Sequence, residues 1–217
     1  MTREQETYVT LRQWVAVGRF LPGERLKLRD VAADLGVGVM PVRAALQRLA
    51  AEGALSYSPN RGVAVPRVSP AEFDDILQTR LLLEGEAAER GALRLSTADR
   101  EALREDVGLM AVALSQHDAK AYLTANENFH VRLYRAAGSP LLMMLIETVW
   151  LRIGPLSNQL FEEAMAPAVL NDAHDDLMRA LDAGDSAAAR RAIERDLFVA
   201  GQFLRRRCAS PADGNRP

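Results

Sequence analysis

The stretch from Asp30 to Arg48, DVAADLGVGVMPVRAALQR, constrains the fold more than any other part of this chain. Apolar residues at helical spacing end at Gly36, and a second run with the same spacing begins after Pro41. The pattern predicts a helix, a tight turn and a second helix. Two helices this short cannot bury themselves, but the second can lie crosswise to the first and enter the major groove of DNA.

The charges are distributed unevenly along the chain, in a way that agrees with DNA binding. Residues 1–67 contain ten Lys and Arg against six Asp and Glu, whereas residues 68–217 contain 17 against 23. A positive excess suits contact with a phosphate backbone, although an excess of this size is equally compatible with an ordinary solvated surface.

Composition places the chain among soluble intracellular proteins. Its 217 residues are 48% hydrophobic and 26% charged, which is enough for two modest domains. The single cysteine, Cys208, excludes an internal disulfide framework and fits a reducing compartment. The longest apolar run, at 141–151, contains Glu147 and is too short to cross a bilayer. We therefore expect a cytoplasmic protein without a membrane segment.

The flanks of the helix pair predict a winged helix-turn-helix over residues 1–67. A supporting helix is expected from Thr7 to Gly18, followed by a Pro-Gly turn. After the second helix, ALSYS and VAVP surround the turn PNRG at 59–62, which predicts two short strands with Arg61 and Gly62 at their tip. Such a wing can touch the minor groove or the flanking phosphates.

Residues 8–66 closely resemble the winged helix-turn-helix of the GntR family of bacterial transcription factors. The PGERL turn, the LGV-x-x-x-PVR-x-AL-x-RL core and the RG wing tip occur together at the family's spacing. The resemblance implies DNA contacts at Arg25, Arg43, Arg61 and Gly62. Arg48, near the end of the second helix, is a further candidate, although Arg25 and Arg48 could also be plain surface charges.

The chain departs from the family at Gly38, Val39 and Met40, where the family has Ser or Thr, then Arg, then Thr or a similar residue. An arginine at the middle position can bind guanine bidentately, which is worth about 1–3 kcal/mol of discrimination, whereas valine can only touch a thymine methyl group. We therefore expect these three residues to face DNA with an altered base preference, or Val39 and Met40 to pack inside the domain.

Residues 68–208 show helix signals alone, which predicts an antiparallel bundle of six helices. Ser69, Pro70 and Glu72 form a capping box that opens the first helix. Further helices are expected to begin after Ser96, Asp118, Ser139, about 168 and Asp185, and Gly154-Pro155 is expected to break or kink the fourth. Residues 209–217 are expected to be a disordered tail. The fold class is mainly α.

This second part resembles the FCD ligand-binding domain of the FadR branch of the GntR family, in its shorter, VanR-like version. The matching segments are R-LLLEGEAAE from Arg80, NENFH ending at His130, AAGSPLL, and H-DDLMRAL-AGD-AAAR from His174. The resemblance implies a homodimer that binds a palindromic double-stranded operator, and a small organic acid as effector.

A divalent metal site is expected inside this bundle. Asn126 and His130 lie four residues apart on one helix, and His174 and Asp196 lie on the last two helices, where a bundle can bring all four together. The family's usual set at these positions is one aspartate and three histidines. The set in this chain can still bind zinc, nickel, manganese or iron, with lower affinity.

Arg80 is expected to clamp the effector's carboxylate beside the metal, with Arg152 as a second candidate. Three alternatives remain at this point. The polar residues can form a hydrogen-bonded core without metal, the chain can be a helical metal-dependent enzyme with two histidines and a carboxylate, or it can be a DNA-bound scaffold without effector. No nucleophile motif or phosphate-binding loop supports an enzyme.

Overall fold

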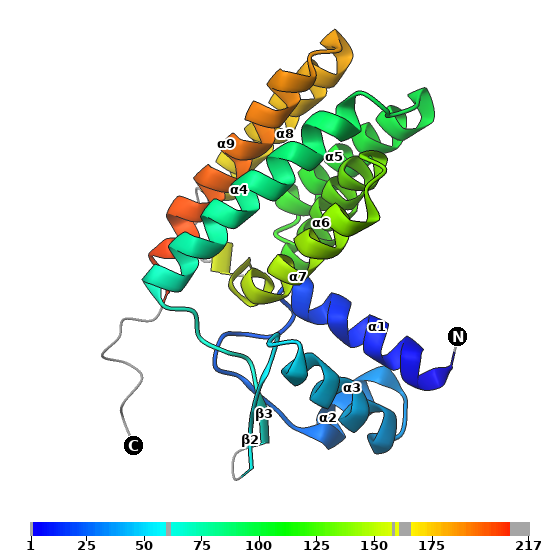
Figure 1. Ribbon diagram of the computed structural model, residues 1–217, viewed down its shortest axis with the longest axis vertical. Helices are drawn as coiled ribbons and strands as arrows, with labels where there is room; N and C mark the ends of the chain where they lie inside the picture. The colour runs from blue at the N-terminus through cyan, green and yellow to red at the C-terminus, as the bar shows by residue number, and fades with distance from the viewer. Residues whose placement is uncertain (1, 60–61, 158, 161–165, 209–217) are drawn as a thin grey trace.

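A small N-terminal part lies below a bundle of long helices in the computed structural model (Figure 1). The structure describes residues 2–59, 62–157, 159–160 and 166–208, with the backbone alone for 166–171. Each part has its own hydrophobic core. The mainly α architecture confirms the predicted fold class. The expected disordered tail, 209–217, lies outside the described residues.

The N-terminal part contains a helix pair, a supporting helix and a small sheet. Its elements are α1 (Arg3–Ala16), β1 (Arg25–Leu26), α2 (Leu28–Leu35), α3 (Val39–Ala51), β2 (Ser56–Ser58) and β3 (Gly62–Ala64). The sheet is antiparallel in the order β1-β3-β2, so the segment before α2 adds a strand to the predicted hairpin. Gly36 ends α2 with a φ of 63°, which a residue with a side chain rarely adopts.

The predicted limits of the supporting helix were wrong. Helix α1 begins at Arg3 because Thr2 and Gln5 form a capping box, in which each side chain accepts a hydrogen bond from the other residue's backbone N–H. It ends at Ala16, before the expected glycine. Leu11 and Val15 are fully buried and α1 packs against α3, so α1 forms part of the domain's core.

Six helices form the second part, and four of them begin at the N-caps that the sequence predicts. They are α4 (Pro70–Ala92), α5 (Thr97–Ser115), α6 (Ala119–Ala136), α7 (Pro140–Ser157), α8 (Ala166–Ala183) and α9 (Ser186–Arg205). Ser69 and Ser96 each sit in a capping box, and the carboxylates of Asp118 and Asp185 accept hydrogen bonds from the first turns of α6 and α9.

Of the predicted break or kink at Gly154-Pro155, the break was wrong, because α7 continues through both residues to Ser157. The proline lies two residues before the end of the helix and removes one backbone hydrogen bond there, without ending the helix. The glycine serves a close approach: a Cβ at Gly154 would lie 2.3 Å from the carbonyl oxygen of Ala16 on α1. The glycine therefore allows the two domains to pack closely.

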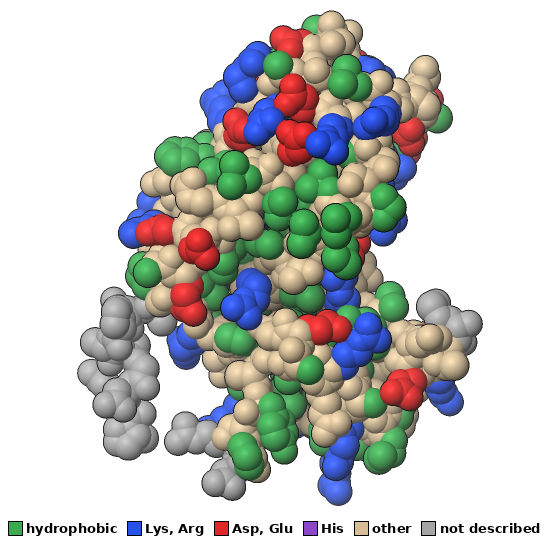
Figure 2. Space-filling view, in the orientation of Figure 1, with side chains coloured by type: hydrophobic (Ala, Val, Ile, Leu, Met, Phe, Trp, Pro, Cys, Tyr) green, Lys and Arg blue, Asp and Glu red, His purple; other side chains and the backbone are tan. Residues whose placement is uncertain are grey.

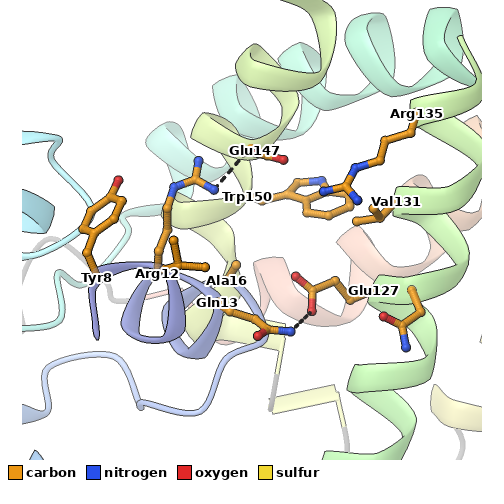
Figure 3. Close-up of a pocket in the computed structure, with 11 residues that line it drawn as sticks. Tyr8, Arg12, Gln13, Ala16, Glu127, Val131, Arg135, Glu147 and Trp150 are labelled. Atoms are coloured by element: carbon orange, nitrogen blue, oxygen red, sulfur yellow. Dashed lines mark hydrogen bonds and ion pairs between the residues drawn. The ribbon is translucent and has the colours of Figure 1, made fainter. Parts of the chain in front are cut away.

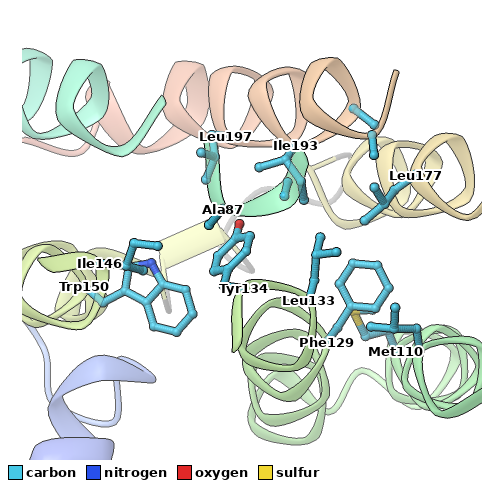
Figure 4. Packing of buried hydrophobic residues seen from close by; sticks show 14 of the residues in the cluster. Ala87, Met110, Phe129, Leu133, Tyr134, Ile146, Trp150, Leu177, Ile193 and Leu197 are labelled. Carbon is cyan, nitrogen blue, oxygen red and sulfur yellow. The ribbon is translucent and has the colours of Figure 1, made fainter. Parts of the chain in front are cut away.

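Aromatic and aliphatic side chains from all six helices fill the bundle (Figure 4). Phe129, Leu133 and Tyr134 project from α6 into its centre, and Trp150 approaches from α7. By length and composition α7 could cross a membrane, with a mean hydropathy of 1.2, but 44% of it is buried inside the protein and it packs against both α1 and α4. These contacts are those of a core helix.

Helix α7 also carries several of the contacts between the two domains. Leu151 is buried in the N-terminal hydrophobic cluster. The guanidinium of Arg12 lies 2.9 Å from the carboxylate of Glu147, and Arg152 donates a 2.8 Å hydrogen bond to the carbonyl of Gly53. Any shift of α7 therefore changes the packing of α1 and of the turn after α3.

Candidate functional site

Three of the predicted DNA contacts, Arg25, Arg43 and Gly62, line a groove of about 480 Å³ between α3 and the wing. Arg43 from α3, Arg25 and Lys27 from the β1 segment and Gly62 from β3 line it, and no acidic residue lies along its wall in the described part of the chain. The side chains of these three cations have no ion pair or hydrogen bond with any described residue. Basic side chains also project from this lower part of the molecule in Figure 2. The groove is therefore suited to an anion such as a phosphate backbone.

The three residues that depart from the family pattern lie at the start of α3. Gly38 is the N-cap, and the side chains of Val39 and Met40 are 37% and 71% exposed. This exposure rules out the alternative in which both pack inside the domain. An apolar surface therefore stands where the family has an arginine.

Arg48 has a different environment from Arg43. Its guanidinium lies 3.7 Å from the centre of the Tyr8 ring, and its Nε donates to Glu52, which also accepts a hydrogen bond from the Tyr8 hydroxyl. These contacts join α1 to α3, so this arginine holds the domain together. Arg61, the predicted wing contact, lies outside the described residues.

Three of the four predicted metal ligands meet inside the bundle. His130 from α6, His174 from α8 and Asp196 from α9 each offer a ligand atom, all within 4.8 Å of one another, and all three residues are buried. Asn126 lies one turn before His130 on α6 and is half-buried. Neither ring nitrogen of His174 has a hydrogen-bond partner among the described residues. A buried polar group without a partner is rare, and a metal ion would satisfy the one nitrogen of the two that carries a lone pair.

Burial also sets the protonation of these groups. It lowers the pKa of His174 to about 4 and holds the pKa of His130 well below its ordinary value, an effect to which the neighbouring His174 and Arg80 contribute. Burial raises the pKa of Asp196 to about 7, against the opposing effect of Arg80. Both imidazoles are therefore neutral at pH 7, which is the form that binds metals.

The structure adds a residue to the site that the sequence reasoning missed. Glu84 is 1% exposed and accepts two hydrogen bonds from Arg80, through Nε at 2.6 Å and Nη2 at 3.3 Å. It also accepts hydrogen bonds from the hydroxyl of Tyr134 and the indole N–H of Trp150. The spacing of Arg80 and Glu84, four residues apart in an apolar helix, was the available signal.

The two predicted effector-binding arginines lie in different places. Arg80 lies in the bundle core with its fork already on a carboxylate, so an effector would have to share it with Glu84 or displace Glu84. Arg152 lies at the contact between the domains, bonded to Gly53. The structure thus does not bring Arg152 together with Arg80.

Comparison with known proteins agrees with both halves of this architecture. Residues 3–65 match the family of bacterial regulatory proteins named gntR, and residues 75–198, more than half of the chain, match the FCD domain. The HTH-type transcriptional regulator McbR of Escherichia coli K12 is 31% identical over 186 residues, which cover 84% of each protein. The chain belongs to the GntR family.

Other similarities to GntR regulators support the same assignment. The HTH-type transcriptional repressor RspR of E. coli K12 is 25% identical over 93% of this chain and 88% of RspR. The solved structure of E. coli McbR/YncC matches with a TM-score of 0.86 and 28% identity, over 95% of this chain and 99% of that one. A GntR regulator from Rhodococcus sp. RHA1, at 22% identity and a TM-score of 0.75, shares the fold over the full length of both chains.

This GntR protein is therefore a DNA-binding transcriptional regulator with an FCD domain. Both matched families and the relatives named above are transcriptional regulators, so the alternative of a helical metal-dependent enzyme is not supported.

Proposed function

We propose that this regulator is a cytoplasmic repressor that binds a palindromic operator as a homodimer and senses a small organic acid held beside a divalent metal in the FCD domain. The observation that carries the proposal is the buried pair of His130 and His174 with Asp196, in which both ring nitrogens of His174 lack partners among the described residues. The name of RspR supports a repressor.

The ligand set supports a borderline divalent cation. Two imidazole nitrogens and one carboxylate oxygen suit zinc, nickel or manganese, and the amide oxygen of Asn126 is a weak fourth ligand. A metal with protein ligands on one side keeps positions for a small molecule on the other. When bound, the ion supplies a positive charge that attracts an anionic effector.

Arg80 supports the choice of a carboxylate as effector. Its guanidinium is a planar fork that binds carboxylates bidentately, and the acceptor that it holds in this structure, Glu84, is itself a carboxylate. An organic acid with one carboxylate on the metal has the chemistry to compete for this fork.

An apolar stripe on α7 supports the homodimer. Leu141, Met144 and Leu145 are 63%, 54% and 42% exposed and lie at helical spacing on one face, and Leu82 on the neighbouring helix α4 is 69% exposed. Figure 2 shows apolar side chains gathered over the middle of the bundle. A two-fold pairing of such a surface would place two recognition helices on two half-sites.

The experiment combines metal analysis with ligand screening. Protein purified without a histidine tag is analysed for metal, and its melting temperature is measured with zinc, nickel or manganese and with small carboxylates. We expect about one metal per chain in the wild type and none in His130→Ala or His174→Ala. A wild type that no added metal can load would refute the metal site, and a melting temperature that no carboxylate changes would favour a scaffold without effector.

DNA binding is tested in parallel with duplexes selected from a random library. We expect an inverted repeat whose binding falls steeply with salt, because the interface neutralises phosphates. Recovery of a single, non-repeated site bound by a monomer would refute the homodimeric reading.

A further inference from the structure

A chain of polar contacts leads from the candidate metal site to helix α7. The ring of His130 has Nε2 3.5 Å from Oδ2 of Asp196, and its Nδ1 lies 3.0 Å from the hydroxyl of Tyr134. That hydroxyl donates to Glu84 at 2.9 Å, and Glu84 accepts the indole N–H of Trp150 at 3.0 Å. Four helices, α9, α6, α4 and α7, are thereby linked through buried groups.

The direction of each hydrogen bond follows from which groups can donate. The carboxylate of Glu84 faces Arg80 and Trp150, which are donors only, so the single hydroxyl proton of Tyr134 points toward Glu84. The tyrosine oxygen then accepts a hydrogen bond from His130, which puts the imidazole proton on Nδ1. The lone pair of His130 is left on Nε2, the atom that faces Asp196. This is the tautomer that a metal ion between the two residues requires.

The last residue in this series of polar contacts, Trp150, lies at the contact between the domains. Trp150 forms part of the wall of a pocket of about 560 Å³ between α1, α6 and α7 (Figure 3). One turn earlier on the same helix, Glu147 pairs with Arg12 of the DNA-binding domain. Figure 4 shows the same tryptophan from the bundle side, next to Tyr134. A change at Glu84 therefore reaches the α1–α7 contact through one side chain.

We propose that Tyr134 is a positioning residue that couples ion binding at His130 to the interface between the domains. It holds the histidine in the metal-binding tautomer, and through Glu84 it holds Trp150 and hence α7. If His130 moves toward Asp196 when an ion binds, the hydrogen bonds between Tyr134, Glu84 and Trp150 would rearrange. The packing of α7 against α1 would then change. The inference rests on the proposed metal site, and its test separates the two.

Fluorescence provides the first measurement, because the chain has only two tryptophans. Trp14→Phe leaves Trp150 as the sole reporter, and zinc chloride is the probe, with bound zinc measured by equilibrium dialysis. We expect the Trp150 emission to change as zinc binds. Adding Tyr134→Phe should weaken zinc binding by ~10- to 100-fold and abolish the emission change at saturation. The control is Leu103→Met, a volume-conserving change at a buried apolar residue of α5, which should keep both.

Operator affinity provides a second measurement that needs no metal. With EDTA present, Tyr134→Phe and Trp150→Phe should each change the affinity for the selected operator by ~5-fold or more, whereas Leu103→Met should not. Circular dichroism establishes that each variant is folded.

The outcomes distinguish the two proposals. Zinc that binds the wild type without changing Trp150 emission, or an emission change that survives Tyr134→Phe, overturns the coupling and leaves the metal site standing. Absence of zinc binding refutes the metal site and with it the coupling to an ion, and the operator measurement then decides only whether Tyr134 and Trp150 link the core to the DNA-binding domain. Unchanged operator affinity in both Tyr134→Phe and Trp150→Phe overturns the proposed role of Tyr134, whether or not zinc binds.

Discussion

Arg43 on the DNA-binding face and Arg80 in the helical core show the same side chain in two opposite environments. The guanidinium of Arg43 borders an exposed basic groove and has no partner among the described residues. The guanidinium of Arg80 is 15% exposed and bound by Glu84, which is itself 1% exposed. The first arginine keeps its hydrogen-bonding capacity for another molecule, whereas the second uses that capacity inside the fold.

The difference separates the expected effects of mutation. A charge in water contributes little to folding, so its removal changes binding and leaves stability almost unaltered. A buried charge has lost its hydration, so the removal of its partner leaves a large uncompensated cost. The DNA-binding face should therefore respond to mutation in its affinity, and the core should respond in its unfolding free energy.

The largest effect is expected for the partner of the buried arginine. Glu84→Gln keeps the volume but leaves Arg80 without a counter-charge, and should lower the unfolding free energy by about 3–5 kcal/mol in urea titrations. Glu86→Gln is the matched control, because this carboxylate has a side chain that is 37% exposed and pairs with Arg90 on the same helix and Arg190 on α9. Its loss should be below about 1 kcal/mol. Equal losses of unfolding free energy in Glu84→Gln and Glu86→Gln would contradict the expected difference between a buried and a solvent-accessible ion pair.

The next effect concerns DNA affinity. Arg43→Ala should weaken operator binding by up to about 3 kcal/mol per half-site while the melting temperature of the protein stays unchanged. Arg48→Ala should do the reverse, with a small loss of stability from the broken Tyr8 and Glu52 contacts and near-normal binding. Wild-type operator affinity in Arg43→Ala would show that α3 does not read DNA through this residue.

A third prediction uses pH to probe the core without metal. The pKa of His174 in the folded protein, about 4, lies below its ordinary value of 6.5. Its contribution to the unfolding free energy is therefore fully present above pH 6.5 and is lost as pH falls toward 4. The folded pKa of Asp196, about 7, lies above its ordinary 3.8, so its contribution is present at low pH and lost as pH rises through 7. The two trends oppose each other between pH 5 and 7.

Removing the titration of Asp196 should reveal the pH dependence of the histidine. In EDTA, Asp196→Asn should lose about 2 kcal/mol more unfolding free energy than the wild type when the pH is lowered from 7 to 5. Urea titrations at both pH values measure this difference. The same pH dependence in the two proteins would mean that Asp196 is not the group that opposes the histidines.

The smallest effect is expected at the start of α3. Val39→Arg restores the family residue at a position that is 37% exposed, and should change the preferred base at one position of each half-site, with about 1 kcal/mol of new discrimination. Selection from a randomised duplex library reads out this change. An unaltered base preference would place Val39 outside the readout of the operator.

Local patterns determined much of the architecture from the sequence alone. The helix pair and the wing hairpin were predictable because each depends on residues within a few positions of one another. The same holds for the helix N-caps at Ser69, Ser96, Asp118 and Asp185. Local patterns failed at Gly154, where a close approach to α1 looked like a helix end. The candidate metal ligands were found through the family resemblance and their helical spacing.

Only the tertiary structure decided which polar groups are partners. His130, His174 and Asp196 meet because α6, α8 and α9 each carry one of these side chains into the interior of the bundle. Glu84 accepts hydrogen bonds from Arg80, Tyr134 and Trp150, which lie on α4, α6 and α7. The same packing takes Arg48 and Arg152 into contacts within and between the domains. A sequence determines local conformation through short-range sterics and capping, but the burial and pairing of a charge depend on residues that are distant along the chain.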